Sequence, residues 1–275
     1  EMCIRDRCKV AIENGVSTGM PDDKSLKFTF TEYFGGLGTA SRAWAARGHT
    51  PVSYFEKSST LSSIYRAAFP ACATFGTLAS ILASASMMAK FAYASSTATV
   101  AISGAPCQAF SRAGLMPGSK AACAYLYNEQ TALVSACRPP VFITEQVPEV
   151  ATIEKGRFQR KLTGDLRSLN YTTVSSILDS SNYGSAQCRR RLYTIAILPE
   201  VIAKCGPFFF DLPVVAHKAS VIDIMDPPSQ ALRKLMVPFT YRRLPQSSVD
   251  HYSGPKPTHV TGNGSDKIGR YSYDI

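Results

Sequence analysis

The chain has 275 residues, of which 30 are Lys or Arg and 20 are Asp or Glu, so its formal net charge is +10. Because 45% of the residues are hydrophobic and only 18% are charged, the composition excludes a disordered chain and a very small disulfide scaffold. The length suits one sizeable α/β domain with a small appendage. The basic balance favours a polyanionic partner, nucleic acid first, over charge that serves solubility alone.

Short β-rich runs alternate with helix-like runs from residue 27 onward, whereas residues 1–26 lack periodicity and are expected to be an unstructured or non-native segment. The predicted strands are 27–34, 51–56, 98–103, 141–146, 172–178 and 192–198. The predicted helices are 40–47, 59–68, 78–92, 121–137 and 157–169. This alternation indicates an α/β fold with a Rossmann-like, doubly wound and mostly parallel sheet. Beyond residue 199, Pro, Gly, Ser and basic residues predict a small irregular region over 200–275.

The cysteines and the most apolar stretch set limits on metal and membrane binding. The chain has eight cysteines but no Cys-x-x-Cys pair, so neither a zinc site nor a disulfide framework is expected. Residues 78–94 are interrupted by serines and by Lys90, and they are too short and mixed for a membrane-spanning helix. We therefore expect an intracellular protein without a metal and without membrane contact.

A glycine-rich turn follows the first predicted strand and leads into a helix, with the sequence Phe34-Gly35-Gly36-Leu37-Gly38. Glycines let a backbone turn tightly and approach a ligand at the carboxyl end of a strand, where doubly wound sheets bind nucleotides. Glu56, followed by Lys57, ends the second strand, where a carboxylate can accept hydrogen bonds from a ribose. Taken alone, the turn can also be ordinary strand-to-helix geometry, and Glu56 can be simply solvated.

The predicted strand 98–103 leads into a loop that contains Pro106-Cys107-Gln108. Pro106 fixes φ and removes a backbone donor, so the loop can present the Cys107 sulfur to a pocket as a nucleophile. The alternative is a buried loop cysteine. Arg189 and Arg191 are two residues apart at the entry to the last strand, so we expect them on the same side and Arg190 on the other. A run of three arginines can also be a solvated or phosphate-facing patch.

Four motifs, which follow one another along the chain in the family's order, resemble those of the C5 cytosine-specific DNA methyltransferase family over about residues 28–198. Pro106-Cys107-Gln108-x-Phe110-Ser111 resembles its nucleophile motif, and Phe34-x-Gly36-x-Gly38 resembles its S-adenosylmethionine loop. Glu145-Gln146-Val147 is similar to its Glu-Asn-Val strand end, and Gln187-x-Arg189-x-Arg191 is similar to its Gln-x-Arg-x-Arg element. The resemblance implies a class I methyltransferase core over 27–199 and part of a target-recognition region over 200–275.

The resemblance also implies the chemistry. Cytosine C5 is a poor nucleophile, so the Cys107 thiolate would add at C6, with Glu145 at N3, Arg191 at O2 and Arg189 supporting the catalytic loop. We expect the two arginines to favour the thiolate form of Cys107. S-adenosyl-L-methionine would contact Phe34, Gly35, Gly36, Leu37, Gly38, Glu56, Lys57, Thr77, Leu78 and Pro106. Double-stranded DNA, bound by a monomer with the target base flipped out, would contact Gln108, Ser111, Gln187, Arg242 and Arg243.

Some positions depart from the family's pattern. Thr77 stands where an Asp usually meets the adenine, Gln146 replaces Asn, and the motifs that close the family's C-terminus are not found. We therefore expect the sequence to be a fragment that is poorly expressed or inactive alone. Two further functions remain open: methylation of cytosine in tRNA, which needs the same thiol and cofactor, and a DNA-binding module that has lost turnover.

Overall fold

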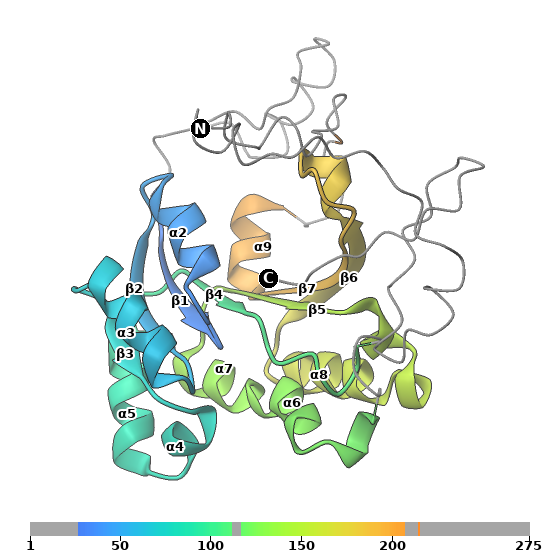
Figure 1. Ribbon diagram of the computed structural model, residues 1–275, viewed down its shortest axis with the longest axis horizontal. Coiled ribbons are helices and arrows are strands. Elements are labelled where there is room, and N and C mark those ends of the chain that lie inside the picture. Colours follow the sequence, from blue (N-terminus) through green and yellow to red (C-terminus); the bar gives the residue numbers. More distant parts are fainter. Residues whose placement is uncertain (1–26, 112–116, 207–213, 215–275) are drawn as a thin grey trace, which may run out of the picture.

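The computed structural model describes residues 27–111, 117–206 and 214. Within these ranges seven strands form one sheet, in the order β3-β2-β1-β4-β5-β7-β6 (Figure 1). The strands are β1 (Thr29–Tyr33), β2 (Thr50–Phe55), β3 (Ala73–Phe75), β4 (Val100–Ser103), β5 (Val141–Gln146), β6 (Thr172–Asp179) and β7 (Arg190–Ile197). The predicted segment 1–26 and the predicted DNA contacts Arg242 and Arg243 lie outside the described residues.

The sheet is mixed but mostly parallel, as the sequence predicts. Neighbouring strands from β3 to β5 run parallel, whereas β7 lies antiparallel to both β5 and β6. The chain first builds outward from β1 through β2 to β3, and then crosses to β4 on the other side of β1. The loops that follow β1 and β4 therefore leave neighbouring strands at the point where the direction of winding reverses, which is where open α/β sheets bind ligands.

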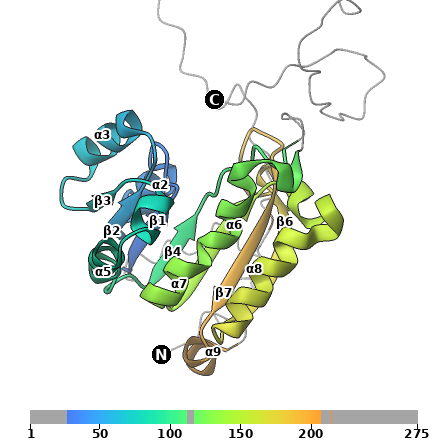
Figure 2. The ribbon, with the colours of Figure 1, turned by 90° about the horizontal axis from the view of Figure 1, so that it is seen from below.

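Helices cover both faces of the sheet. On one face lie α5, α7 and α8, and on the other lie α2 and α9 (Figures 1 and 2). The helices are α2 (Thr39–Ala45), α3 (Ser59–Ala68), α4 (Leu78–Leu82), α5 (Ala85–Ala94), α6 (Leu126–Glu129), α7 (Thr131–Cys137), α8 (Arg157–Ser168) and α9 (Pro199–Cys205). None of these helices, which belong to the described ranges, is long and apolar enough to cross a membrane.

The main core lies between the sheet and the layer formed by α5, α7 and α8. Tyr33, Phe91 and Phe142 are fully buried there and pack ring against ring. On α8, Phe158, Leu162 and Leu166 recur every four residues, so one helical face is apolar and is buried. This burial explains why the basic segment predicted as helix 157–169 forms a helix, with its charged residues on the outer face.

The structure corrects several predicted elements. The predicted helix 78–92 is two helices, because the Ser84 side chain caps α5 by accepting a hydrogen bond from the Met87 amide at 3.3 Å. The predicted helix 121–137 begins with one 3-10 turn, η2 (Ala122–Tyr125), and continues as α6 and α7, and a further 3-10 turn, η1 (Gly118–Lys120), precedes it. Strand β3 and helix α9 are not predicted from the sequence.

Helix α9 occupies the predicted boundary between the two regions of the chain. Its Val201 packs against the main core. The proposed division at residues 199 and 200 stays a prediction, because nearly all of the second region lies outside the described residues.

Candidate active site

The two loops predicted to carry function begin side by side. Tyr33 at the end of β1 pairs with Ser103 at the end of β4, and the Gly104 amide donates to the Tyr33 carbonyl at 3.2 Å. Both loops therefore leave the same edge of the sheet. A ligand held by the glycine loop and a reactive group on the loop after β4 can meet at this edge.

The glycine loop needs backbone angles that favour glycine. Strand β1 ends at Tyr33 because Phe34 has φ +54°, and φ is +55° at Gly36 and +74° at Gly38. The Gly35 amide donates to the Phe55 carbonyl at 3.1 Å, and the Gly38 amide donates to the Gly35 carbonyl at 2.7 Å. The loop is thus a defined turn that leads directly into α2, with the side chain of Leu37 half exposed.

Glu56 holds this loop from the end of β2. Its Oε2 accepts a hydrogen bond from the Gly36 amide at 3.2 Å, and its Oε1 accepts one from the Ser58 amide at 2.9 Å. Each oxygen has lone-pair capacity left for a second donor. The carboxylate therefore fits the predicted role of accepting ribose hydroxyls beside the glycine loop. Lys57 is exposed next to it.

The remaining predicted cofactor contacts have mixed positions. Thr77 caps α4, and its Oγ1 accepts from the Ser80 amide at 3.0 Å, which leaves its hydroxyl hydrogen as a donor. The side chain of Leu78 is buried in the main core, so only its main chain is available to a ligand. Pro106 is half buried at the start of the second loop.

The second loop forms a tight turn around Cys107. The Cys107 carbonyl accepts hydrogen bonds from the amides of Phe110 at 2.8 Å and Ser111 at 2.9 Å. Phe110 is fully buried and anchors the turn in the main core, whereas Gln108 is exposed at its tip. Cys107 itself is half buried and packs against the core. The sulfur is therefore partly accessible, and the choice between a nucleophile and a structural loop cysteine stays a prediction.

A carboxylate and two guanidinium groups meet at the ends of β5 and β7. Glu145 Oε1 lies 2.9 Å from Arg191 Nε and 3.8 Å from Arg189 Nη2. Side-chain exposure is 18% for Arg191, 29% for Glu145 and 42% for Arg189, so the pair with Arg191 is the more enclosed. The two arginines therefore lie on the same side, as the spacing predicts, and reach the same carboxylate. Arg190, like Arg189, is exposed.

The charges of this cluster change the pKa of Cys107 in opposite directions. Burial raises the pKa of the Cys107 thiol above its ordinary value. Arg191 opposes this most strongly by lowering the pKa, Glu145 raises it, and Arg189 lowers it. Both arginines therefore favour the thiolate, as expected, but the loss of water around the sulfur outweighs their charges and keeps the pKa of Cys107 above its ordinary value.

Gln146 connects the acidic strand end to the nucleophile loop. This residue is 1% exposed, its Nε2 donates to the Ala105 carbonyl at 3.2 Å, and its Oε1 accepts from the Val147 amide at 2.9 Å. The longer side chain at this position, where the family has Asn, is thus hydrogen-bonded through both its nitrogen and its oxygen. The sequence shows the exchange, but it does not show the bond to Ala105, which lies 41 residues earlier in the chain.

Gln187 lies in the turn before β7. Its main chain orders this turn, because its carbonyl accepts from Ser180 Oγ at 2.6 Å and its amide donates to Ser185 Oγ at 3.2 Å. Its side chain is exposed. The predicted contact of Gln187 with DNA stays a prediction.

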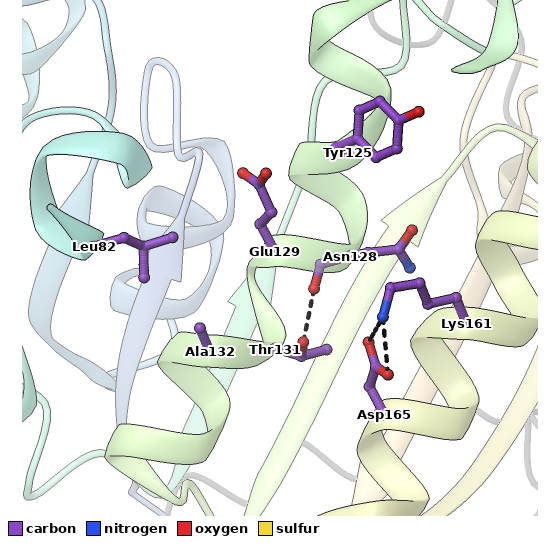
Figure 3. Close-up of a pocket in the computed structure, with 8 residues that line it drawn as sticks. All are labelled: Leu82, Tyr125, Asn128, Glu129, Thr131, Ala132, Lys161 and Asp165. Atoms are coloured by element: carbon purple, nitrogen blue, oxygen red, sulfur yellow. Dashed lines mark hydrogen bonds and ion pairs between the residues drawn. The ribbon is translucent and has the colours of Figure 1, made fainter.

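A separate hollow of about 350 Å³ lies within the helical layer on one face of the sheet. Figure 3 shows its lining, which comes from α4, η2, α6, α7 and α8 and includes the ion pair between Lys161 and Asp165. None of the predicted site residues lines it. The hollow is therefore distinct from the edge that carries the two loops.

The seven-stranded mixed sheet, with a glycine loop after β1 and a carboxylate after β2, defines an α/β protein of the methyltransferase class. A solved DNA modification methyltransferase encoded within a prophage of E. coli has the same fold, with a TM-score of 0.58 and 21% sequence identity over 71% of this chain and 53% of that one. The family model of the C-5 cytosine-specific DNA methylases matches residues 28–251. The chain therefore belongs to the C-5 cytosine-specific DNA methylase family.

Curated relatives agree with this family. The type II methyltransferase M.SsoII of Shigella sonnei is 29% identical over 127 residues, which are 46% of this chain and 33% of that protein. The type II methyltransferase M.HgiCI of Herpetosiphon aurantiacus is 36% identical over 96 residues, which are 35% of this chain and 23% of that protein. The matches thus span a third or less of the length of these two relatives.

Proposed function

We propose that this chain carries the catalytic site of a DNA (cytosine-5-)-methyltransferase, which transfers a methyl group from S-adenosylmethionine to C5 of a flipped-out cytosine. The observation that supports this most is the gathering of Cys107, Glu145 and Arg191. Glu145 Oε1 lies 2.9 Å from Arg191 Nε, and the charges of both residues act on the Cys107 thiol. A nucleophile, an acid and a fixed donor are thus available to one ring.

Cys107 acts as the nucleophile. Its thiolate adds to C6 of the cytosine, the C5–C6 double bond breaks, and electron density moves onto C5 while Glu145 donates a hydrogen bond or proton at N3. S-adenosylmethionine, when bound, supplies the methyl group. A water molecule then takes the proton from C5, the electron pair of that bond re-forms the C5–C6 double bond, and the bond between C6 and sulfur breaks. This releases the Cys107 thiolate, and the proton at N3 returns to Glu145.

Arg191 would bind O2 of the cytosine, next to the N3 atom that Glu145 would bind. N3 and O2 are adjacent on cytosine, so a carboxyl group and a guanidinium held side by side match that edge. Arg191 then donates to O2 and stabilises negative charge that builds up on the ring during the attack. Arg189, which is more exposed and lies 3.8 Å from Glu145, supports the position of the carboxyl group.

The cofactor site belongs to the glycine loop. Gly36 has open space around its Cα, since a Cβ added there would meet nothing within 4 Å. A ligand can therefore approach the backbone of residues 34–38 closely. Glu56 would hold the ribose, the Thr77 hydroxyl would face the adenine, and Pro106 would lie between the cofactor and the nucleophile.

The half-buried position of the Cys107 sulfur limits which form of DNA can react. A base stacked inside a duplex does not expose C6 to a half-buried sulfur, so the cytosine must leave the stack. The net charge of +10 fits binding to a phosphate backbone. The family and its type II relatives make DNA the first choice over RNA.

A covalent trap tests this function. The chain, or a longer natural chain that contains it, is incubated with labelled S-adenosylmethionine and duplex DNA in which 5-fluorocytosine replaces cytosine. Fluorine at C5 cannot leave as a proton does, so the bond between Cys107 and C6 should persist and give a stable protein–DNA adduct. Absence of the adduct with the wild type, or an undiminished adduct with Cys107→Ser, would overturn the mechanism. If an adduct forms with tRNA that contains 5-fluorocytosine but not with the DNA, the substrate is tRNA.

A further inference from the structure

The carbonyl of Gly36 has a buried partner that the family motifs do not include. Tyr54 on β2 is 0% exposed, and its hydroxyl donates to the Gly36 carbonyl at 2.6 Å. Burial raises the pKa of Tyr54, and the nearby charge of Glu56 raises it further. The phenol therefore stays protonated at neutral pH and remains a donor.

Both polar groups of the Gly36 main chain are thus in use. Its amide donates to Glu56 Oε2 at 3.2 Å, and its carbonyl accepts from Tyr54. A glycine at φ +55° has no side chain to limit its rotation. These two hydrogen bonds, from the end of β2, fix the orientation of the peptide groups on each side of it.

The ring of Tyr54 also forms part of the floor of the loop. It stacks on Tyr65 from α3, with ring centroids 3.7 Å apart and an interplanar angle of 14°. A Cβ added at Gly35 would lie 2.5 Å from the Tyr54 ring, and one added at Gly38 would lie 2.5 Å from the Tyr65 ring. The stacked pair therefore explains why these two positions are glycine.

We propose that Tyr54 is a positioning residue for the cofactor loop, whose hydroxyl fixes the Gly36 peptide in the form that binds S-adenosylmethionine. This inference rests on the proposed function, because it assigns the loop to that cofactor. Without the Tyr54 hydroxyl, the Gly36 carbonyl is free to rotate, and part of the binding free energy is lost in ordering the loop.

The test compares Tyr54→Phe with Tyr65→Phe. Both variants keep the stacked rings, but Tyr65 bonds to Ser41 Oγ at 2.9 Å and to Cys72 Sγ at 3.6 Å, which are side chains outside the loop. Calorimetry with S-adenosylmethionine should give a Kd about fivefold higher for Tyr54→Phe, as expected for one lost hydrogen bond, and within about twofold of wild type for Tyr65→Phe. Equal affinity of Tyr54→Phe and wild type, or an equal loss in both variants, would overturn the inference.

A second measurement does not depend on cofactor binding. Amide hydrogen exchange of residues 34–38 in the protein without cofactor should be faster in Tyr54→Phe than in wild type, and unchanged in Tyr65→Phe. Unchanged exchange in Tyr54→Phe would overturn the inference even if the variant loses affinity. If the wild type binds S-adenosylmethionine but forms no 5-fluorocytosine adduct, the proposed reaction fails while the role of Tyr54 stands. If the wild type does not bind the cofactor, both fail.

Discussion

Oε1 of Glu145 lies 2.9 Å from Nε of Arg191, across the antiparallel pair of β5 and β7. The two residues come from opposite ends of a long connection that includes α8 and β6. The antiparallel placement of β7 is what brings the start of this strand to the end of β5, where Glu145 lies. The same pairing therefore fixes both the sheet order and the spacing of the acid and the donor.

Replacement of Arg191 should abolish most of the activity without unfolding the protein. Arg191→Met keeps much of the aliphatic stem but removes the donor to the ring and leaves Glu145 with the more distant Arg189. We expect kcat to fall about 100-fold, the effect of losing one donor aimed at developing charge. Methyl transfer to duplex DNA measures this. Arg190→Met is the matched control, since Arg190 is exposed, and an equal loss in that variant would contradict the assignment.

The pH dependence of Cys107 should follow its burial. A free thiol has a pKa of about 8.5, and burial raises the pKa of Cys107 above the ordinary value. Since only the thiolate attacks, the rate of alkylation of Cys107 by iodoacetamide should still be rising with pH above about 8.5. Mass spectrometry of the Cys107 peptide measures this rate.

Two variants test the sign of each charge. Arg191 lowers the pKa of Cys107 and Glu145 raises it. Arg191→Met should therefore move the rising limb to higher pH, and Glu145→Gln should move it to lower pH. Shifts in the same direction for both variants would contradict the charge arrangement.

The sequence predicts the parts of the fold that depend on local patterns. The helices 59–68 and 157–169 and the strand 141–146 are confirmed, because a periodic apolar face or a short β-rich run is visible in each. Strand β3 has only three residues, too few to show a pattern, and its partner β2 supplies its hydrogen bonds. The break at Ser84 depends on whether a serine caps a helix or lies within one, and the sequence allows both.

In the candidate site, too, the sequence predicts the features that depend on local spacing and does not predict those that depend on the folded structure. The spacing of Arg189 and Arg191 predicts a shared side because strands have a period of two. In contrast, the net effect on the Cys107 pKa depends on how much water the fold removes from the sulfur, which no local pattern states. The hydrogen bond from Tyr54 to Gly36 joins positions 18 residues apart. No local sequence pattern at either position predicts this contact.

Gln146 should control the rate of attack rather than cofactor binding. Gln146→Glu keeps an acceptor for the Val147 amide but loses the donor to Ala105, which directly precedes Pro106 and Cys107. We expect the rate of adduct formation with 5-fluorocytosine DNA to fall at least about tenfold, because one hydrogen bond is lost and a buried carboxyl oxygen then faces the Ala105 carbonyl oxygen, with the Kd for S-adenosylmethionine unchanged. A rise in that Kd with an unchanged adduct rate would show that Gln146 does not act through the nucleophile loop.

The glycines of the two loops should respond differently to a methyl group. At Gly38, φ is +74° and an added Cβ would lie 2.5 Å from the Tyr65 ring, so Gly38→Ala combines backbone strain with a steric clash. We expect it to lower the free energy of unfolding by about 2 kcal/mol or more. At Gly104 an added Cβ meets nothing within 4 Å, so Gly104→Ala should change this free energy by less than about 0.5 kcal/mol. Urea denaturation of both variants measures the difference. Similar losses would mean that the stacked tyrosines do not restrict the glycine loop, since Gly104 lies at the same sheet edge without a ring beneath it.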